Sequence, residues 1–172
     1  NPFTGEVWAE VADDSGAVDD AVVSARRALE EGPWSTMPGR ERARLIMRLG
    51  EILTRDAVEL AEAETRDNGK IIRETSSQTA GLQSYLDFFA GMAAKLTGLQ
   101  IPSPSPNFLI YTERVPVGVV GAIIPWNSPL MLLTWKLGPL LAAGCTVVVK
   151  PSDITPVTAL MLAERASEAG FP

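Results

Sequence analysis

The chain contains no histidine and a single cysteine among its 172 residues. The lack of histidine excludes serine–histidine and cysteine–histidine nucleophile pairs and histidine-based metal sites within these residues. A lone cysteine excludes an intrachain disulfide and gives no reason to expect secretion, so the cytoplasm is the default location. Any proton transfer must use a carboxylate, a lysine, a tyrosine or water.

Basic residues are outnumbered by acidic ones, 15 to 21, which gives a formal net charge of -6. An acidic chain is a poor partner for nucleic acid or for an anionic membrane. Residues 115–135 are uncharged and long enough in principle to span a membrane, but three prolines and Asn127 interrupt them. With 46% hydrophobic residues, the chain can form one ordinary globular domain or most of one.

Residues 1–97 are dominated by helical patterns. Apolar residues recur at helical spacing in four segments, which predicts helices near 18–29, 45–53, 56–68 and 71–96. The third should end at Asn68-Gly69, a favourable pair for a helix C-terminus. A weak alternation over Gly5–Val11 predicts an edge strand.

Residues 98–115 have the pattern of an exposed hairpin. A turn rich in proline and serine, Pro102–Pro106, separates the strand candidates Gly98–Ile101 and Phe108–Val115. Two short strands have too little surface for a core of their own. We therefore expect this arm to pair with another chain or with further sequence.

Residues 116–172 form one βαβα unit. Buried strands are predicted over Val117–Ile124 and Thr146–Val149, and helices over Pro129–Ala143 and Pro156–Ala169. Continuous Val/Ile/Leu runs are typical of doubly wound α/β sheets, which bind ligands at the carboxyl ends of their strands. Asn127 and Lys150 follow those ends. The glycine fingerprint of a usual dinucleotide-binding turn, G-x-G-x-x-G, is absent.

Asn127 has two possible roles. Ser128 is a favoured N-cap residue and Pro129 a favoured first residue for the helix that follows. An amide donor just before the positive end of a helix can stabilise negative charge on a substrate oxygen. Alternatively, Asn127 only caps that helix.

Lys150 and Asp153 also allow two interpretations. Ribose hydroxyls accept hydrogen bonds from an ammonium group and donate them to a carboxylate, so the two residues could bind a nucleotide together. Alternatively, they form a weak ion pair on the surface.

Several long segments resemble one known family, in the right order and over essentially the whole chain. They are Asn1–Val7, Asp67–Lys70, Val115–Asn127, Trp135–Cys145 and Val149–Asp153. Together they closely resemble the NAD(P)-dependent aldehyde dehydrogenase superfamily. The resemblance implies an α/β fold, the amino-terminal portion of a Rossmann-like cofactor-binding domain, with a protruding β-hairpin oligomerisation arm.

The resemblance also implies roles for individual residues. Asn127 would donate to the oxyanion, and Lys150 and Asp153 would bind the adenosine ribose, with NAD favoured and NADP possible. The residues implied along the cofactor path are Ile123, Ile124, Pro125 and Trp126. Those implied along the aldehyde tunnel are Ser128, Leu132 and Trp135, with Lys136 close by. Ser128 stands where many members have an aromatic residue, so we expect a wider or more polar tunnel mouth.

Some implied parts are outside these residues. The catalytic domain, with a nucleophilic cysteine and a glutamate base, is expected downstream of Pro172, so the chain by itself should be inactive. Cys145 is expected to be packed and inert. Thr4 and Asp67 match positions near a monovalent cation site in some members.

The resemblance implies that the complete protein oxidises an aldehyde to a carboxylic acid through a cysteine thiohemiacetal and thioester. It would act as a homodimer or homotetramer. A non-catalytic nucleotide-binding or assembly protein on the same scaffold is the alternative, and a downstream cysteine and glutamate in the family's motifs would distinguish the enzyme from it.

We predict that residues 1–172, expressed alone, aggregate or stay partly unfolded. The implied sheet would lack its later strands and the arm its pairing strand, which leaves edges free to associate. Size-exclusion chromatography and thermal melting test this. A monodisperse monomer with a cooperative melt would contradict the prediction.

Overall fold

The computed structural model describes residues 1–13 and 15–172. The helices are α1 (Val18–Glu30), α2 (Gly39–Arg55), α3 (Ala57–Asn68), α4 (Ile72–Ala80), α5 (Leu82–Met92), α6 (Pro129–Ala143) and α7 (Val157–Ala169), with a short 3-10 turn at Ser15–Ala17. The strands are β1 (Gln100–Ile101), β2 (Ile110–Tyr111), β3 (Val119–Ile123) and β4 (Thr146–Lys150). Within the described part of the chain, no helix is long and apolar enough to cross a membrane.

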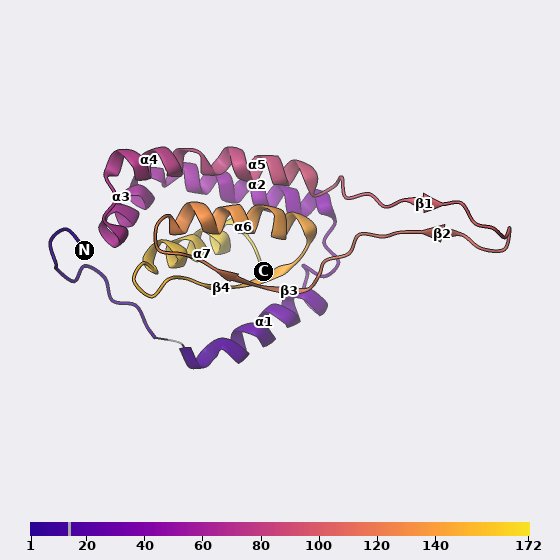
Figure 1. Cartoon of the computed structure of the whole chain (residues 1–172), viewed down its shortest axis with the longest axis horizontal. Helices are drawn as coiled ribbons and strands as arrows, with labels where there is room; N and C mark the ends of the chain where they lie inside the picture. Colours follow the sequence, from indigo (N-terminus) through magenta and orange to yellow (C-terminus); the bar gives the residue numbers. More distant parts are fainter. Residues whose placement is uncertain (14) are drawn as a thin grey trace.

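The predicted βαβα unit forms. Strands β3 and β4 are parallel, and the register runs from Val119 opposite Thr146 to Ile123 opposite Lys150. Figure 1 shows α1 on one side of this pair, with α6 and α7 on the other side and α2 and α5 beyond them. A parallel pair with helices on both sides is the expected arrangement for part of a Rossmann-like sheet. The strands are less buried than predicted, since only Ala122 of β3 and β4 is buried and the other residues are half-buried or exposed.

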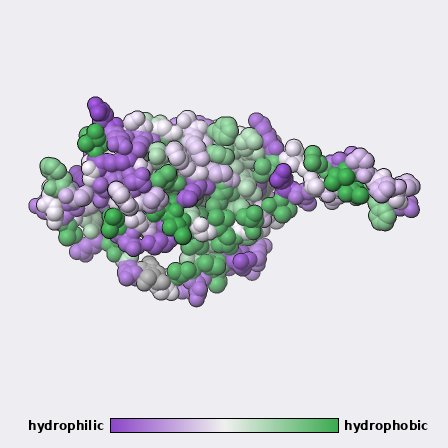
Figure 2. Space-filling view, viewed as in Figure 1, coloured by the Kyte–Doolittle hydropathy of each residue, from purple (hydrophilic) through white to green (hydrophobic). Residues whose placement is uncertain are grey.

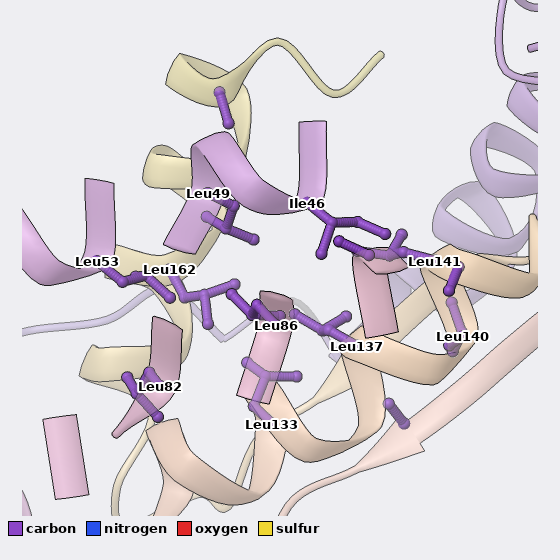
Figure 3. Packing of buried hydrophobic residues seen from close by; sticks show 14 of the residues in the cluster. Ile46, Leu49, Leu53, Leu82, Leu86, Leu133, Leu137, Leu140, Leu141 and Leu162 are labelled. Carbon is purple, nitrogen blue, oxygen red and sulfur yellow. The ribbon is translucent and has the colours of Figure 1, made fainter. Parts of the chain in front are cut away.

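The core lies between the amino-terminal helices and α6. Figure 3 shows side chains from α2, α5, α6 and α7 pointing toward one another. Its labelled members are Ile46, Leu49, Leu53, Leu82, Leu86, Leu133, Leu137, Leu140, Leu141 and Leu162, and each is at most 9% exposed. This packing fixes α6, the helix that follows Asn127, against helices from the start of the chain.

Two predictions for the first half of the chain are wrong. Gly5–Val11 forms no strand; its alternation is weak and buries no face, since Val7 is 81% exposed. The single helix predicted over 71–96 is two helices, α4 and α5, separated at Gly81. The Gly81 N–H donates to the Gln78 carbonyl (3.2 Å), a tight turn that the apolar spacing does not reveal.

The hairpin segment extends from one end of the molecule as a thin arm (Figure 1). Gln100–Ile101 and Ile110–Tyr111 pair in antiparallel register inside the predicted segment, and Leu99 and Thr112 hydrogen-bond next to them. Figure 2 shows hydrophobic residues along the arm. The large apolar residues exposed in the segment 98–115 are Leu99, Ile101, Phe108, Leu109, Ile110, Tyr111 and Val115.

The start of α6 is capped by a distant carboxylate and not by its own serine. Ser128 stands at the N-cap as predicted, but its hydroxyl makes no capping bond to α6. The Leu130 N–H donates instead to Glu64 Oε2 of α3 (3.1 Å), and the Thr158 hydroxyl contacts the same oxygen (3.5 Å). A carboxylate is a stronger acceptor than a hydroxyl, and Glu64 is only 1% exposed.

Helix α3 binds the start of α7 in the same way. The Val157 N–H donates to Asp67 Oδ2 (3.1 Å). Because α6 follows β3 and α7 follows β4, two carboxylates one turn apart on α3 fix both helix starts beside the carboxyl edge of the sheet. The predicted end of α3 at Asn68-Gly69 is confirmed, since Gly69 is the left-handed C-cap (φ 79°).

We predict that Glu64 makes the stability of the complete protein pH-dependent. Burial raises the pKa of Glu64, although the Leu130 N–H, Lys70 and Thr158 oppose the rise. The folded state then binds more protons than the unfolded state above about pH 4.5, the ordinary value, so this contribution falls as pH rises through the folded pKa.

The measurement compares wild type with Glu64→Gln, which keeps the shape of the side chain and does not titrate. We expect the melting temperature of wild type relative to Glu64→Gln to be highest below about pH 4.5 and to fall toward neutral pH. A difference that is constant or grows with pH would contradict the raised pKa.

Candidate functional site

The carboxyl ends of β3 and β4 meet at one edge. Ile123 is the register partner of Lys150, and the Ile124 N–H donates to the Lys150 carbonyl (3.0 Å). The segments that continue from these strands, residues 124–128 and 151–155, therefore leave the sheet side by side. The parallel pairing predicted from the apolar runs brings the two groups of candidate residues together.

Lys150 and Asp153 form an ion pair at this edge. Lys150 Nζ lies 2.5 Å from Asp153 Oδ1, and the side chains are 59% and 87% exposed. An ion pair this exposed contributes little to stability. The same exposure leaves the ammonium and the carboxylate accessible to a ligand, so the geometry is compatible with both interpretations.

The four residues implied along the cofactor path differ in exposure. Ile123 and Trp126 are 74% and 56% exposed, and Pro125 is also exposed. Ile124 is only 2% exposed and belongs to the core. The edge thus has exposed apolar and aromatic side chains beside a charged pair. The buried side chain of Ile124 packs in the core and holds the end of β3 in place.

An open cleft of about 700 Å³ adjoins this edge. Its lining includes Trp126, Asp153, Asp67 and the start of α7. Burial raises the pKa of Asp67, while the Val157 N–H, the N-terminal ammonium and Trp8 oppose the rise. Of the two cation candidates, both in the described part of the chain, Asp67 lines this cleft and Thr4 does not. The Thr4 hydroxyl accepts from the Glu6 N–H (3.3 Å).

No group of three or more His, Cys, Asp or Glu residues within 1–13 and 15–172 could bind a metal ion.

Asn127 is exposed between the end of β3 and the start of α6. Its backbone carbonyl accepts from the Ser128 hydroxyl (2.8 Å) and from Asn68 Nδ2 (3.4 Å). Since Glu64 caps α6, the helix does not require the Asn127 side chain as a cap. Glu64 satisfies one free N–H of α6, and both interpretations of Asn127 stay predictions.

The tunnel candidates Ser128, Leu132 and Trp135 share one face of α6, since they are four and three residues apart. Ser128 is 3% exposed, Leu132 is half-buried and Trp135 is 45% exposed. The Tyr85 ring stacks on Trp135 (centroids 5.9 Å apart), and its hydroxyl donates to the Trp135 carbonyl (3.1 Å). Lys136 is exposed beside this face.

Gly138 permits this contact between α5 and α6. A Cβ at this position would lie 3.0 Å from Phe89 and 3.3 Å from the Tyr85 ring. The absence of a side chain therefore lets Tyr85 approach α6 closely enough to reach Trp135.

Sequence reasoning did not identify the distant residues that contact the candidate site. Glu64, Asn68, Lys70 and Tyr85 act on residues at least 50 positions away, which no local spacing rule can reveal. The sequence offered one indication of these contacts, the segment Asp67–Lys70 at the end of a helix. Its residues are polar except for Gly69.

Cys145 is buried (4% exposed), as expected for a packed cysteine. Its backbone N–H donates to the Leu140 carbonyl (3.1 Å) just after the end of α6. The thiol belongs to the core and not to the strand edge that carries Asn127 and Lys150.

Comparison with known proteins identifies this arrangement. The model of the aldehyde dehydrogenase family matches residues 1–172. The chain is 46% identical to aldehyde dehydrogenase, cytosolic 1, of Mus musculus, and the match covers 100% of this chain and 35% of that protein.

Two solved structures extend the comparison. A betaine aldehyde dehydrogenase variant from Staphylococcus aureus in complex with NAD+ matches with a TM-score of 0.96 and 37% identity, over 100% of this chain and 35% of that one. An NADP-dependent enzyme of E. coli matches with a TM-score of 0.84 and 35% identity, over 90% of this chain and 32% of that one.

The chain spans about a third of the length of these relatives. The four predicted elements of the βαβα unit are present in the structure, and the family model matches the whole chain. The chain belongs to the aldehyde dehydrogenase family.

Proposed function

We propose that the complete protein oxidises an aldehyde to a carboxylic acid with NAD+, and that NADP+ is the less favoured cofactor. The observation that carries this proposal is Asn127, an exposed amide donor whose helix is already capped by Glu64. A residue that the fold does not need as a cap is available to bind a substrate oxygen. Membership of the aldehyde dehydrogenase family supports the reaction class.

The strand edge has the chemistry that a dinucleotide requires. Exposed Ile123 and Trp126 offer apolar surface to a base or ring, and Lys150 and Asp153 offer a donor and an acceptor to ribose hydroxyls. A bound nicotinamide cofactor would accept the hydride that leaves the aldehyde carbon. Lys150 and Asp153 would keep that cofactor in one orientation.

Asn127 would act on the charge that develops during the reaction. When a nucleophile from the catalytic domain attacks the aldehyde carbon, the carbonyl oxygen becomes negative. A preorganised amide donor stabilises that oxygen in the transition state more than in the ground state. The start of α6 adds its partial positive charge nearby. Leu132 and Trp135 would line the path of the aldehyde. The binding of a monovalent cation beside Thr4 and Asp67 is a separate prediction.

The arm suggests assembly through residues 98–115. Its exposed apolar side chains have no core of their own, and contact with a second copy would cover them. We propose a homodimer or homotetramer, and a cytoplasmic location in line with the cytosolic mouse relative.

The catalytic role of Asn127 predicts a specific kinetic effect. Asn127→Ala in the complete protein should lower kcat by about 10²- to 10³-fold, the usual effect of removing one oxyanion donor. The KM for cofactor and the melting temperature should stay nearly constant, because Glu64 still caps α6. Wild-type turnover with a stability loss of about 1 kcal/mol would show that Asn127 is structural.

The ribose-binding role of Asp153 predicts a shift in cofactor preference. Asp153→Ser removes a negative charge that would repel a 2′-phosphate, so kcat/KM for NADP+ relative to NAD+ should rise. Because Asp153 is 87% exposed, screening limits the shift to about fivefold. Asp87→Ser, which removes an exposed carboxylate on α5, is the matched control. An equal ratio in both variants would favour the surface-pair interpretation.

A further inference from the structure

Lys70 connects the end of α3 to the segment that carries Asn127. It follows the left-handed Gly69 and is largely buried, with its side chain 19% exposed. Its ammonium group lies 2.5 Å from Ser128 Oγ, 3.1 Å from Gln78 Oε1 and 3.2 Å from Glu74 Oε1. An ammonium group has three N–H donors, and three acceptors surround this one, so all three donors are paired. These contacts hold the ammonium group in one place.

The contact with Lys70 fixes the direction of the Ser128 hydroxyl. An ammonium group cannot accept a hydrogen bond, so Ser128 Oγ must accept from Lys70. The only hydroxyl hydrogen is then free to donate to the Asn127 carbonyl, which lies 2.8 Å away. Ser128 is 3% exposed, so no solvent competes for this hydrogen.

The neighbouring Asn68 supports the same carbonyl. Its Oδ1 accepts from the Lys70 backbone N–H (2.9 Å), which orients the amide so that Nδ2 points to the Asn127 carbonyl (3.4 Å). The peptide after Asn127 therefore has two donors. One is the Ser128 hydroxyl, which the Lys70 side chain orients, and the other is Asn68 Nδ2, whose amide is held by the Lys70 backbone N–H. The Asn127 side chain itself is exposed, so this peptide determines the position from which its amide projects.

We propose that the Lys70 side chain is a positioning group for Asn127: through Ser128 it orients the peptide from which the amide donor projects. This inference rests on the proposed function. An oxyanion donor is effective only within about 2.7–3.1 Å of the developing charge. A misplacement of about 1 Å can cost about 10²-fold in rate. Loss of the Lys70 contact should therefore reduce turnover although Lys70 touches no substrate.

The experiment is a double-mutant cycle on the complete protein. Lys70→Met keeps most of the side-chain volume and removes the three donors. We expect it to lower kcat by about 10- to 10²-fold with little change in the KM for cofactor. In an Asn127→Ala background, Lys70→Met should lower kcat no further, because the donor that it orients is absent.

Glu74→Gln is the matched control. It removes the ion pair on the far side of Lys70 and leaves the contact with Ser128, so kcat should be unchanged even if the melting temperature falls. If Lys70→Met does not fold, Ser128→Ala takes its place in the same cycle, since it deletes the hydroxyl between Lys70 and the Asn127 carbonyl.

The possible outcomes separate the two proposals. Equal losses from Lys70→Met in both backgrounds, or an equal loss from Glu74→Gln, would show a general structural role and overturn the inference. Unchanged kcat in Lys70→Met, with turnover lost in Asn127→Ala, would overturn the inference and keep the proposed function. Wild-type turnover in Asn127→Ala would overturn both.

Discussion

The buried carboxylate of Glu64 is the interaction on which the arrangement of this chain depends. Removing a carboxylate from water is costly, and the cost is offset only if its oxygens find donors. The Leu130 N–H at the start of α6 and the Thr158 hydroxyl on α7 are those donors. Moving either helix away from α3 would take one donor from a buried carboxylate, so Glu64 favours the observed positions of both helices relative to α3.

This constraint links the first helices of the chain to the strand edge. Glu64 and Asp67 bind the starts of α6 and α7, and those starts follow directly from the ends of β3 and β4. Residues that precede the sheet in sequence therefore determine how its loops leave the carboxyl edge. The amino-terminal helices are part of the site's support as well as part of the core.

The sequence predicted what depends on local periodicity. The bounds of α6, the positions of the two parallel strands and the end of α3 follow from apolar spacing and from proline or glycine at the right positions. The predicted burial of the strands does not, since only Ala122 of β3 and β4 is buried. The meeting of Ile123 and Lys150 followed from parallel pairing. The helix break at Gly81 was missed, because a glycine within an apolar stripe fits either a continuous helix or a turn.

The capping of α6 could not be predicted locally. Ser128 satisfies the usual rule for an N-cap, but Glu64, 66 residues away, supplies the acceptor for Leu130. The hydroxyl of Ser128 was thereby free to accept from Lys70. Contacts between residues far apart in sequence decide which partner each polar group binds. Such contacts can be identified only in the folded structure.

The orientation of Ser128 bears on the aldehyde path. The resemblance predicted a tunnel mouth that is wider or more polar, because an aromatic residue is common at this position. The Ser128 hydroxyl is 3% exposed and bonded to Lys70 and to the Asn127 carbonyl, so it adds no polar group to the surface. An aromatic ring could not accept this bond from Lys70 in the same way. We therefore expect Ser128 to change the volume of the tunnel mouth and the hydrogen bonding of the Asn127 carbonyl. We do not expect it to change the polarity of the tunnel mouth.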